Sequence, residues 1–383
     1  MRAPVDLDPQ TIAAALAPLL QRLATPALVI DLDAVDHNIA AMRRRAGDRW
    51  RPHLKTLKSG ALLGRLLAAE VTRCKVATLD ELELALTTAD QHGVALDVLL
   101  AYPQHPAALL AARARAAASP RCSVHFLLDS PEHAAVLAYA LPLATPLSVF
   151  LDVDLGMGRT GASPATWRPA LPALLADPGL RIAGLHGYEG HLEWDDHAGA
   201  SAAHDELCAL ARELPDNSLE IVTSGTHSYA AALRHPGLAG GPWTHRVSPG
   251  TVVLADLHSR AAMTDLGLRQ AVVIASRVIS TAVGRITLDA GSKALAPDRP
   301  ASSARVLGWP GLTPRARSEE HLVVAVADDD DAPGLGDLLL LVPDHVCTSV
   351  NLYRHALLLR DGAMFAEAAI EASSRRLWLT GAP

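Results

Sequence analysis

Short apolar runs recur from Ala27 to Thr223, and an alanine- and leucine-rich stretch of helical character follows each of them. Apolar runs that end in polar or glycine residues are typical of buried strands, and the stretches between them are long enough for helices. The alternation therefore predicts consecutive βα units, whose strand-forming runs lie at 28–31, 50–53, 75–77, 97–100, 124–128, 147–152, 182–186 and 219–222.

Eight such units predict a (β/α)₈ TIM-type barrel, in which each parallel strand is followed by a helix on the outside. The alternative is an open, doubly wound sheet, which normally has a glycine-rich turn after its first strand. Residues 31–34, Asp-Leu-Asp-Ala, contain no glycine. We therefore expect an α/β protein that begins with a barrel.

After Pro249-Gly250 the pattern changes to β-branched and apolar stretches separated by turns, at 271–280, 285–289, 321–325 and 337–342. This pattern predicts a mainly antiparallel β domain. Residues 294–317 contain four prolines and are expected to form a long loop. A helix at 9–23 could pack on either domain. We expect the barrel to comprise 25–255 and the β domain to comprise 1–24 and 256–383.

Composition excludes several classes of protein. The chain has 383 residues, and half of them are apolar. Its formal charge is −7, and its longest run of acidic residues is 328–331. We expect no nucleic-acid partner. The first residues lack the order of a signal peptide and no run is long enough for a membrane span, so we expect a cytoplasmic protein without a membrane partner. The four cysteines form no Cys-x-x-Cys pair, which argues against a disulfide framework.

Reactive residues of a barrel lie where strands end and the following loops begin. Polar and glycine-rich segments close four of the predicted strands, at 51–58, 152–161, 186–191 and 223–229. In the C-terminal part, His345 and Cys347 lie two residues apart in a segment that we expect to run from a strand into a loop. Alternate residues of an extended chain point to the same side, so the two side chains can meet.

In the order and spacing of these segments the chain resembles the fold-type III pyridoxal-phosphate enzymes, in the branch that holds D-serine dehydratase, D-threonine aldolase and the 3-hydroxyaspartate lyases. The resemblance covers residues from about 25 to 362. It is carried by Thr25-Pro26-Ala27 before Asp31-Leu32-Asp33, by Pro-His-x-Lys-Thr at 52–56, by Asp-Ala-Gly-Ser-Lys-Ala at 289–294, and by Pro-Asp-His-Val-Cys at 343–347.

The resemblance implies that Lys55 binds pyridoxal 5′-phosphate covalently, a role that requires an amine of lowered proton affinity. Lys58 could supply the positive charge that lowers it. Without the resemblance, Lys55 and Lys58 would fit a solvated helix face equally well. The implied catalytic residues are Lys55, Tyr188 and His191, and the implied cofactor-binding residues are Lys55, Arg159, Tyr188, Ser224, Gly225, Thr226, Gly250 and Thr251.

His345 and Cys347 match the metal ligands of the family. Members with D-threonine aldolase activity typically carry His-x-Asp at this place, and D-serine dehydratases carry His-x-Cys. A thiolate with an imidazole favours zinc, whereas a carboxylate with an imidazole suits manganese or magnesium. Two protein ligands would leave positions for water and for the substrate. A buried cysteine beside a histidine that caps a helix is the structural alternative.

The predicted function is that of a lyase, dependent on pyridoxal phosphate and a metal, that acts on a D-3-hydroxy amino acid such as D-serine, D-threonine or 3-hydroxyaspartate. We expect β-elimination to a 2-oxo acid and ammonia, with retro-aldol cleavage to glycine and an aldehyde as the alternative. A non-catalytic cofactor carrier or a racemase would not need the metal ligands. The family resemblance also implies a homodimer. Leu57 and Glu189 depart from the family pattern, since many members have histidine at these two positions.

Overall fold

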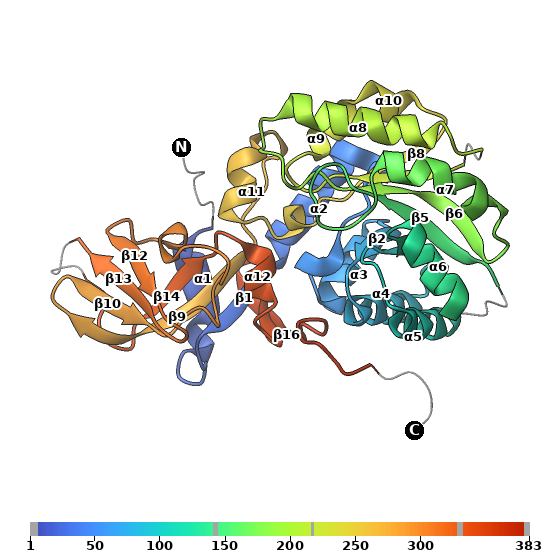
Figure 1. The fold of residues 1–383 in the computed structure, drawn as a ribbon. Coiled ribbons are helices and arrows are strands. Elements are labelled where there is room, and N and C mark those ends of the chain that lie inside the picture. Colours follow the sequence, from blue (N-terminus) through green and yellow to red (C-terminus); the bar gives the residue numbers. More distant parts are fainter. Residues whose placement is uncertain (1–6, 141–144, 216–217, 328–331, 379–383) are drawn as a thin grey trace. The chain divides into compact units, whose positions relative to one another are not determined.

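The structure is a computed structural model that describes residues 7–140, 145–215, 218–327 and 332–378 (Figure 1). The acidic run 328–331 lies outside the described residues. The chain divides into two compact units. The sheet unit comprises residues up to Met42, 56–65 and 251–374, and the barrel unit comprises 43–55, 66–250 and the residues from Arg375 onward. Residues 25–42, which we expected in the barrel domain, are part of the sheet unit.

The barrel unit is built on a parallel sheet whose strands follow one another in chain order. They are β2 (Arg73–Val76), β3 (Asp97–Leu100), β4 (Ser123–Leu128), β5 (Leu147–Val153), β6 (Leu180–Gly187), β7 (Glu220–Thr223) and β8 (Thr244–Val247). The segment 50–53 joins the two ends of this sheet, because Trp50 forms a parallel bridge with Val247 and His53 forms one with Lys75. These bridges complete the ring of parallel strands, and the predicted TIM-type barrel is confirmed.

One predicted barrel strand was wrong and one was missed. The run 28–31 belongs to β1 (Ala27–Asp31), which pairs in parallel with β15 (His355–Arg360) and antiparallel with β9 (Val272–Ala282) in the sheet unit. Its place in the barrel ring is taken by β8, whose sequence Thr-His-Arg-Val is mostly polar and was not among the predicted apolar runs. The polar side chains are paired, since Arg246 forms an ion pair with Glu220 and His245 Nε2 lies 2.8 Å from Thr223 Oγ1.

Helices follow the barrel strands, as the alternating pattern predicted. They are α4 (Leu79–His92), α5 (Pro106–Ala117), α6 (Pro131–Ala140), α7 (Pro164–Ala176), α8 (His197–Ala211), α9 (Tyr229–Arg234) and α10 (Pro236–Gly240). Capping residues mark several starts, as where Thr78 accepts a hydrogen bond from the Glu81 N–H. A small apolar cluster on the strands is formed by Leu99, Leu127, Phe150 and Val222. Helices α2 (Leu32–Ala46) and α3 (Gly60–Ala68) contribute residues to both units.

The sheet unit contains a mainly antiparallel sheet, as predicted. Its strand order is β12 (Leu312–Arg317), β13 (Leu322–Val326), β10 (Arg285–Leu288), β9, β1, β15 and β16 (Ala363–Ala369), while β14 (Leu338–Val342) pairs with β9 and with β11 (Arg305–Val306). The prediction of a loop at 294–317 was wrong in part, because β11 and β12 lie within it. Strand β12 is at the sheet edge and its register shifts beside Pro314, which is where a strand tolerates proline.

The N-terminal helix is α1 (Pro9–Leu16) and belongs to the sheet unit. The sequence pattern did not indicate on which of the two domains it packs. Its Ile12 and Leu16 are buried in a core with Val29, Val273 and Leu359. Two further short helices complete this unit, α11 (Leu257–Ala262) and α12 (Val346–Val350). None of the helices in the described part of the chain has the length and apolar character that a membrane span requires.

Candidate active site

Lys55 follows the closing segment of the barrel, at its carboxyl end. The side chain is exposed, and the backbone N–H donates to His53 Nδ1 at 3.3 Å. An accessible amine at this end of a barrel strand suits covalent chemistry with an aldehyde. Lys58, which we expected to act on Lys55 by its charge, donates its ammonium group to the Ala372 carbonyl at 3.1 Å in the sheet unit.

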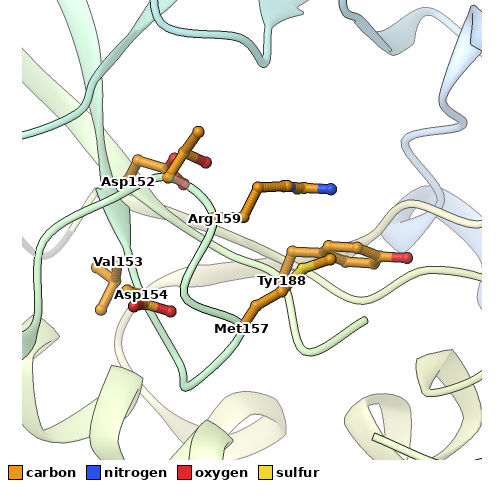
Figure 2. Close-up of a pocket in the computed structure, with 7 residues that line it drawn as sticks. Asp152, Val153, Asp154, Met157, Arg159 and Tyr188 are labelled. Atoms are coloured by element: carbon orange, nitrogen blue, oxygen red, sulfur yellow. The ribbon is translucent and has the colours of Figure 1, made fainter. Parts of the chain in front are cut away.

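Arg159 and Tyr188 come together at the ends of β5 and β6. The Arg159 guanidinium carbon lies 5.2 Å from the centre of the Tyr188 ring, within the range of a cation–π interaction. Both residues line a small pocket with Asp152, Asp154 and Met157, and Figure 2 shows the Arg159 side chain extending alongside the ring. The family resemblance implied that both residues bind the cofactor, and the structure brings them together.

His191 is exposed and lies against the glycine-rich turn that precedes Arg159. A Cβ atom added to Gly156 would come within 3.2 Å of His191 Nε2. The turn itself is held by Asp154, whose Oδ1 accepts from the backbone N–H groups of Gly156 at 3.0 Å and Gly158 at 3.1 Å. His191 can therefore reach the same face of the barrel unit as Arg159.

The predicted phosphate-binding turn follows β7. Ser224 has a positive φ of 66°, an unusual conformation for a residue with a side chain. A Cβ atom on Gly225 would lie 2.9 Å from Tyr188 Cε2, so only glycine lets the turn approach the ring this closely. Thr226 continues the turn. Gly250 belongs to the same unit and is buried, and the preceding Pro249 carbonyl accepts from Trp50 Nε1 at 2.9 Å.

His345 and Cys347 are brought together in the sheet unit, but not by an extended chain. His345 is the N-cap of α12 and Cys347 lies in its first turn, so our expectation of two alternate residues in an extended segment was wrong. Their side chains are close enough for each to shift the pKa of the other. Thr56 Oγ1 lies 3.1 Å from the Cys347 Sγ, and Thr251 Oγ1 lies 3.4 Å from it.

The charges of this pair favour a thiolate. Burial alone raises the pKa of the Cys347 thiol, but the hydrogen bond and charge of His345 outweigh it, and the net pKa is lowered. Burial lowers the pKa of His345, whereas Cys347 and then Asp298 raise it, to about 9. His345 Nδ1 lies 2.6 Å from Asp298 Oδ2, which leaves Nε2 available to a metal. Within the described residues, no group of three or more potential ligands forms.

Sequence reasoning missed two buried polar groups of the barrel unit. One contains Lys75, His186 and Asp152. Asp152 and His186 begin two of the strand-closing segments found in the sequence, but no sequence pattern linked them to Lys75. The other contains Glu189, the residue that departs from the family pattern. Glu189 pairs with His204 at 3.2 Å, and both side chains are fully buried. Burial raises the pKa of Glu189, but the hydrogen bond and the charge of His204 lower it, to about 2. The predicted phosphate-binding turn is tied to this residue through the backbone, because His227 Nε2 lies 3.0 Å from the Glu189 carbonyl oxygen.

With this geometry in view, comparison with known families identifies the chain. Residues 30–256 match the family described as "Alanine racemase, N-terminal domain", which is more than half of the chain. The chain belongs to the alanine racemase N-terminal domain family. Residues 271–359 match a second family, described as "Putative serine dehydratase domain". The recognition made from the sequence is therefore confirmed.

Two curated relatives match nearly the whole chain. A D-threonine aldolase of Arthrobacter sp is 29% identical over 370 residues, covering 90% of this chain and 91% of the relative. A D-threo-3-hydroxyaspartate dehydratase of Delftia sp. (strain HT23) is 29% identical over 392 residues, covering 90% of this chain and 97% of the relative. The relatives of this chain therefore include one named as an aldolase and one named as a dehydratase.

Solved structures agree with the fold. A D-threonine aldolase from Filomicrobium marinum has a TM-score of 0.77 and 26% identity, covering 92% of this chain and 96% of that chain. A D-threo-3-hydroxyaspartate dehydratase with a cysteine replaced by alanine has a TM-score of 0.72 and 24% identity, covering 91% of this chain and 98% of that one. That variant is described as being in the metal-free form.

Proposed function

We propose that this member of the family is a lyase that uses pyridoxal 5′-phosphate and a divalent metal to remove the β-hydroxyl of a D-3-hydroxy amino acid. The products are a 2-oxo acid and ammonia. The observation that supports elimination best is the contact between His345 and Cys347, whose pKa shifts favour a thiolate. The relatives named above support the class of substrate, because D-threonine and D-threo-3-hydroxyaspartate both carry a hydroxyl on carbon 3.

The residues of the barrel unit fit the cofactor. Lys55 offers an exposed amine for its aldehyde, and Arg159 and Tyr188 offer a cation and a ring beside its pyridine. Gly225 lacks the Cβ that would close the turn, so backbone N–H groups of Ser224, Gly225 and Thr226 can receive a phosphate. Gly250 and Thr251 are proposed as a second phosphate-binding turn. When bound, pyridoxal phosphate withdraws electrons from the substrate α-carbon.

The side chains of the protein then handle protons. Lys55 Nζ takes the α-proton, which it reaches in a D-amino acid and not in the L-isomer. Tyr188 and His191 are proposed to orient the substrate and to hold a proton at the phenolic oxygen or the imidazole. The exposed position of His191 permits exchange of that proton with water.

The ligand chemistry of His345 and Cys347 fits a divalent metal, and a thiolate with an imidazole favours zinc over manganese or magnesium. Such a metal would act as a Lewis acid on the β-hydroxyl of the substrate. Asp298 orients the His345 ring through its contact with Nδ1. Thr56 and Thr251 can donate hydrogen bonds to the Cys347 sulfur.

Retro-aldol cleavage to glycine and an aldehyde is the second candidate, and the match to a D-threonine aldolase over 90% of this chain favours it. Incubation with D-serine, D-threonine and the D-isomers of 3-hydroxyaspartate distinguishes the two candidates. Elimination releases ammonia and a 2-oxo acid, and cleavage releases glycine and an aldehyde. Racemisation to the L-isomer, or no reaction with any of these substrates, would contradict both.

A homodimer is proposed from the family resemblance. Analytical ultracentrifugation of the purified protein tests this proposal, and a single species with the mass of one chain would contradict it.

A further inference from the structure

Lys75 is a second lysine of the barrel unit, and unlike Lys55 it is buried. It lies in β2 with 5% of its surface exposed. Its strand is the neighbour of the segment that leads into Lys55, because the Lys75 N–H donates to the Pro52 carbonyl at 2.9 Å and Lys75 forms a bridge with His53. The two lysines therefore extend from adjacent strands of one barrel.

A hydrogen-bonded chain holds the Lys75 amine in place. Lys75 Nζ lies 3.2 Å from His186 Nε2, and His186 Nδ1 lies 2.7 Å from Asp152 Oδ1. All three side chains are buried. The carboxylate of Asp152 keeps the proton of the imidazole on Nδ1, so Nε2 accepts a hydrogen bond from Lys75. A buried amine with this fixed acceptor is positioned rather than mobile.

The same amine lies against the residue that we propose to flank the cofactor ring. Lys75 Nζ is 6.0 Å from the centre of the Tyr188 ring, which also interacts with Arg159. A lysine charge at this place costs desolvation energy, which His186, Asp152 and the ring offset only in part. Neither a strand nor an apolar core needs a cation there, so the arrangement requires another explanation.

Charged groups of several neighbouring elements act on Lys75. Burial lowers its pKa most, repulsion by Lys55 lowers it next, and Arg159 lowers it further. Asp152 on β5 and Glu189 after β6 act in the opposite direction, and the resulting pKa is about 7. Lys75 therefore exchanges its proton near neutral pH. Because Coulomb repulsion is mutual, a proton on Lys75 also acts on any positive charge at Lys55.

We propose that Lys75 is a positioning residue that presents a positive charge to Lys55. This charge sets the proton affinity of the Lys55 nitrogen through which the cofactor is bound. His186 and Asp152 fix the place of this charge. The inference rests on the proposed function, since it assumes that Lys55 carries pyridoxal phosphate. A neighbouring amine that lowers the proton affinity of a reactive lysine is an established way to activate it.

The test compares Lys75→Met, which removes the charge, with Lys75→Arg, which makes it permanent. In each holoenzyme the visible absorption of the bound cofactor is followed against pH. We expect the midpoint of the spectral transition in Lys75→Arg to lie below that in Lys75→Met by about one pH unit or more, with the unmodified protein between them. Lys293→Met is the control, because Lys293 is exposed and pairs with Glu319 and Glu320.

Equal midpoints in the Lys75→Met and Lys75→Arg proteins would overturn the inference. If Lys75→Met does not accumulate as folded protein, Lys75→Gln replaces it, since glutamine is also neutral and can donate to His186. Borohydride reduction and peptide mapping of the same samples keep the two proposals apart. A label on Lys55 with equal midpoints contradicts only the role of Lys75, whereas a label on Lys75, or no label, contradicts the proposed function itself.

Discussion

At the scale of single residues, the environment of each side chain decides what its chemistry can be. Lys55 and Lys75 have the same side chain, but one is exposed and the other is enclosed with an imidazole and a ring. Cys347 is a thiol whose pKa is lowered by His345 in spite of its burial. The other three cysteines are different, because burial raises the pKa of Cys74, Cys122 and Cys208. Cys347 is therefore the thiol best suited to bind a metal.

We predict that the purified protein is yellow and that borohydride fixes the cofactor to Lys55, because its exposed amine lies at the carboxyl end of a barrel strand. Peptide mapping by mass spectrometry locates the label. Lys55→Ala protein should remain folded and lose the colour. A label on Lys58 or on Lys293 would contradict the assignment.

We predict that Cys347→Ala protein loses most of its bound metal, because two protein ligands give the site little redundancy. Metal content after dialysis is measured by mass spectrometry of the element. Asp298→Asn should weaken binding by about 10–100-fold, since Asp298 is proposed to orient the ligand His345 and not to bind the metal itself. Glu367→Gln, in which an exposed carboxylate of β16 is changed, is the control. Unchanged metal content in Cys347→Ala would rule out this site.

At the scale of elements, two connections carry most of the proposed cofactor site. The turn after β7 approaches Tyr188, which follows β6, so closely that Gly225 has no room for a side chain. Glu189 and His204 join the end of β6 to helix α8 through a buried hydrogen bond, and His227 of the turn contacts the Glu189 carbonyl oxygen. A turn held by such contacts is fixed before the cofactor binds, which lowers the entropic cost of binding.

We predict that Gly225→Ala lowers the affinity for pyridoxal phosphate by about tenfold, because the added methyl group would collide with the Tyr188 ring and overpacking costs about 1–3 kcal/mol. Titration of the protein without cofactor, followed by absorbance, gives the affinity. Gly240→Ala is the matched control, since a Cβ atom at Gly240 meets nothing within 4 Å. Equal affinities of the two variants would show that the turn does not contact the phosphate.

We predict that Glu189→Gln lowers the free energy of unfolding by about 3 kcal/mol at neutral pH, because it breaks a buried pair. The pKa of Glu189 falls from 4.5 to about 2 on folding, so its contribution to stability is present above about pH 4.5 and is lost as the pH falls toward 2. The difference between the two proteins in urea unfolding should therefore shrink below pH 4.5. Glu132→Gln, at an exposed position of α6, should show no such difference.

At the scale of the whole molecule, the barrel unit supplies the residues proposed for the cofactor apart from Thr251, and the sheet unit supplies Thr251 and the residues proposed for the metal. A lone barrel with a cofactor lysine would suffice for a carrier. The chain matches a serine dehydratase domain in its C-terminal part as well, and both curated relatives described above match along 90% of it. The complete chain is therefore the unit on which the reaction must be measured.

We predict that elimination dominates, because a thiolate ligand favours zinc, which tolerates low coordination and can hold a leaving hydroxide. A D-3-hydroxy amino acid should give ammonia and a 2-oxo acid with little glycine, and L-isomers should not react. Chelation should lower turnover by more than about 100-fold, since the metal acts on the leaving group itself. Equal amounts of glycine and aldehyde without ammonia would establish the aldolase reaction.

The sequence by itself determined the features that depend on local pattern. Apolar runs and the helical stretches after them predicted the βα units, because burial of one side of a strand or helix repeats at short range. The segments that carry Lys55, Arg159, Tyr188 and Ser224 were found for the same reason, since each closes a predicted strand. The order of these segments was enough to indicate the family.

Only the tertiary structure decided which strands pair and which buried charges meet. An apolar run such as 28–31 can enter either sheet. The strands with which it pairs, β9 and β15, lie more than two hundred residues later in the chain. Polar β8 is stable inside the barrel because Glu220 and Thr223 on β7 pair with its side chains. The role proposed for Lys75 likewise depends on its contact with His186, which is 111 residues away in the chain. Burying a charge is costly unless a partner is present, and the position of that partner is a property of the fold.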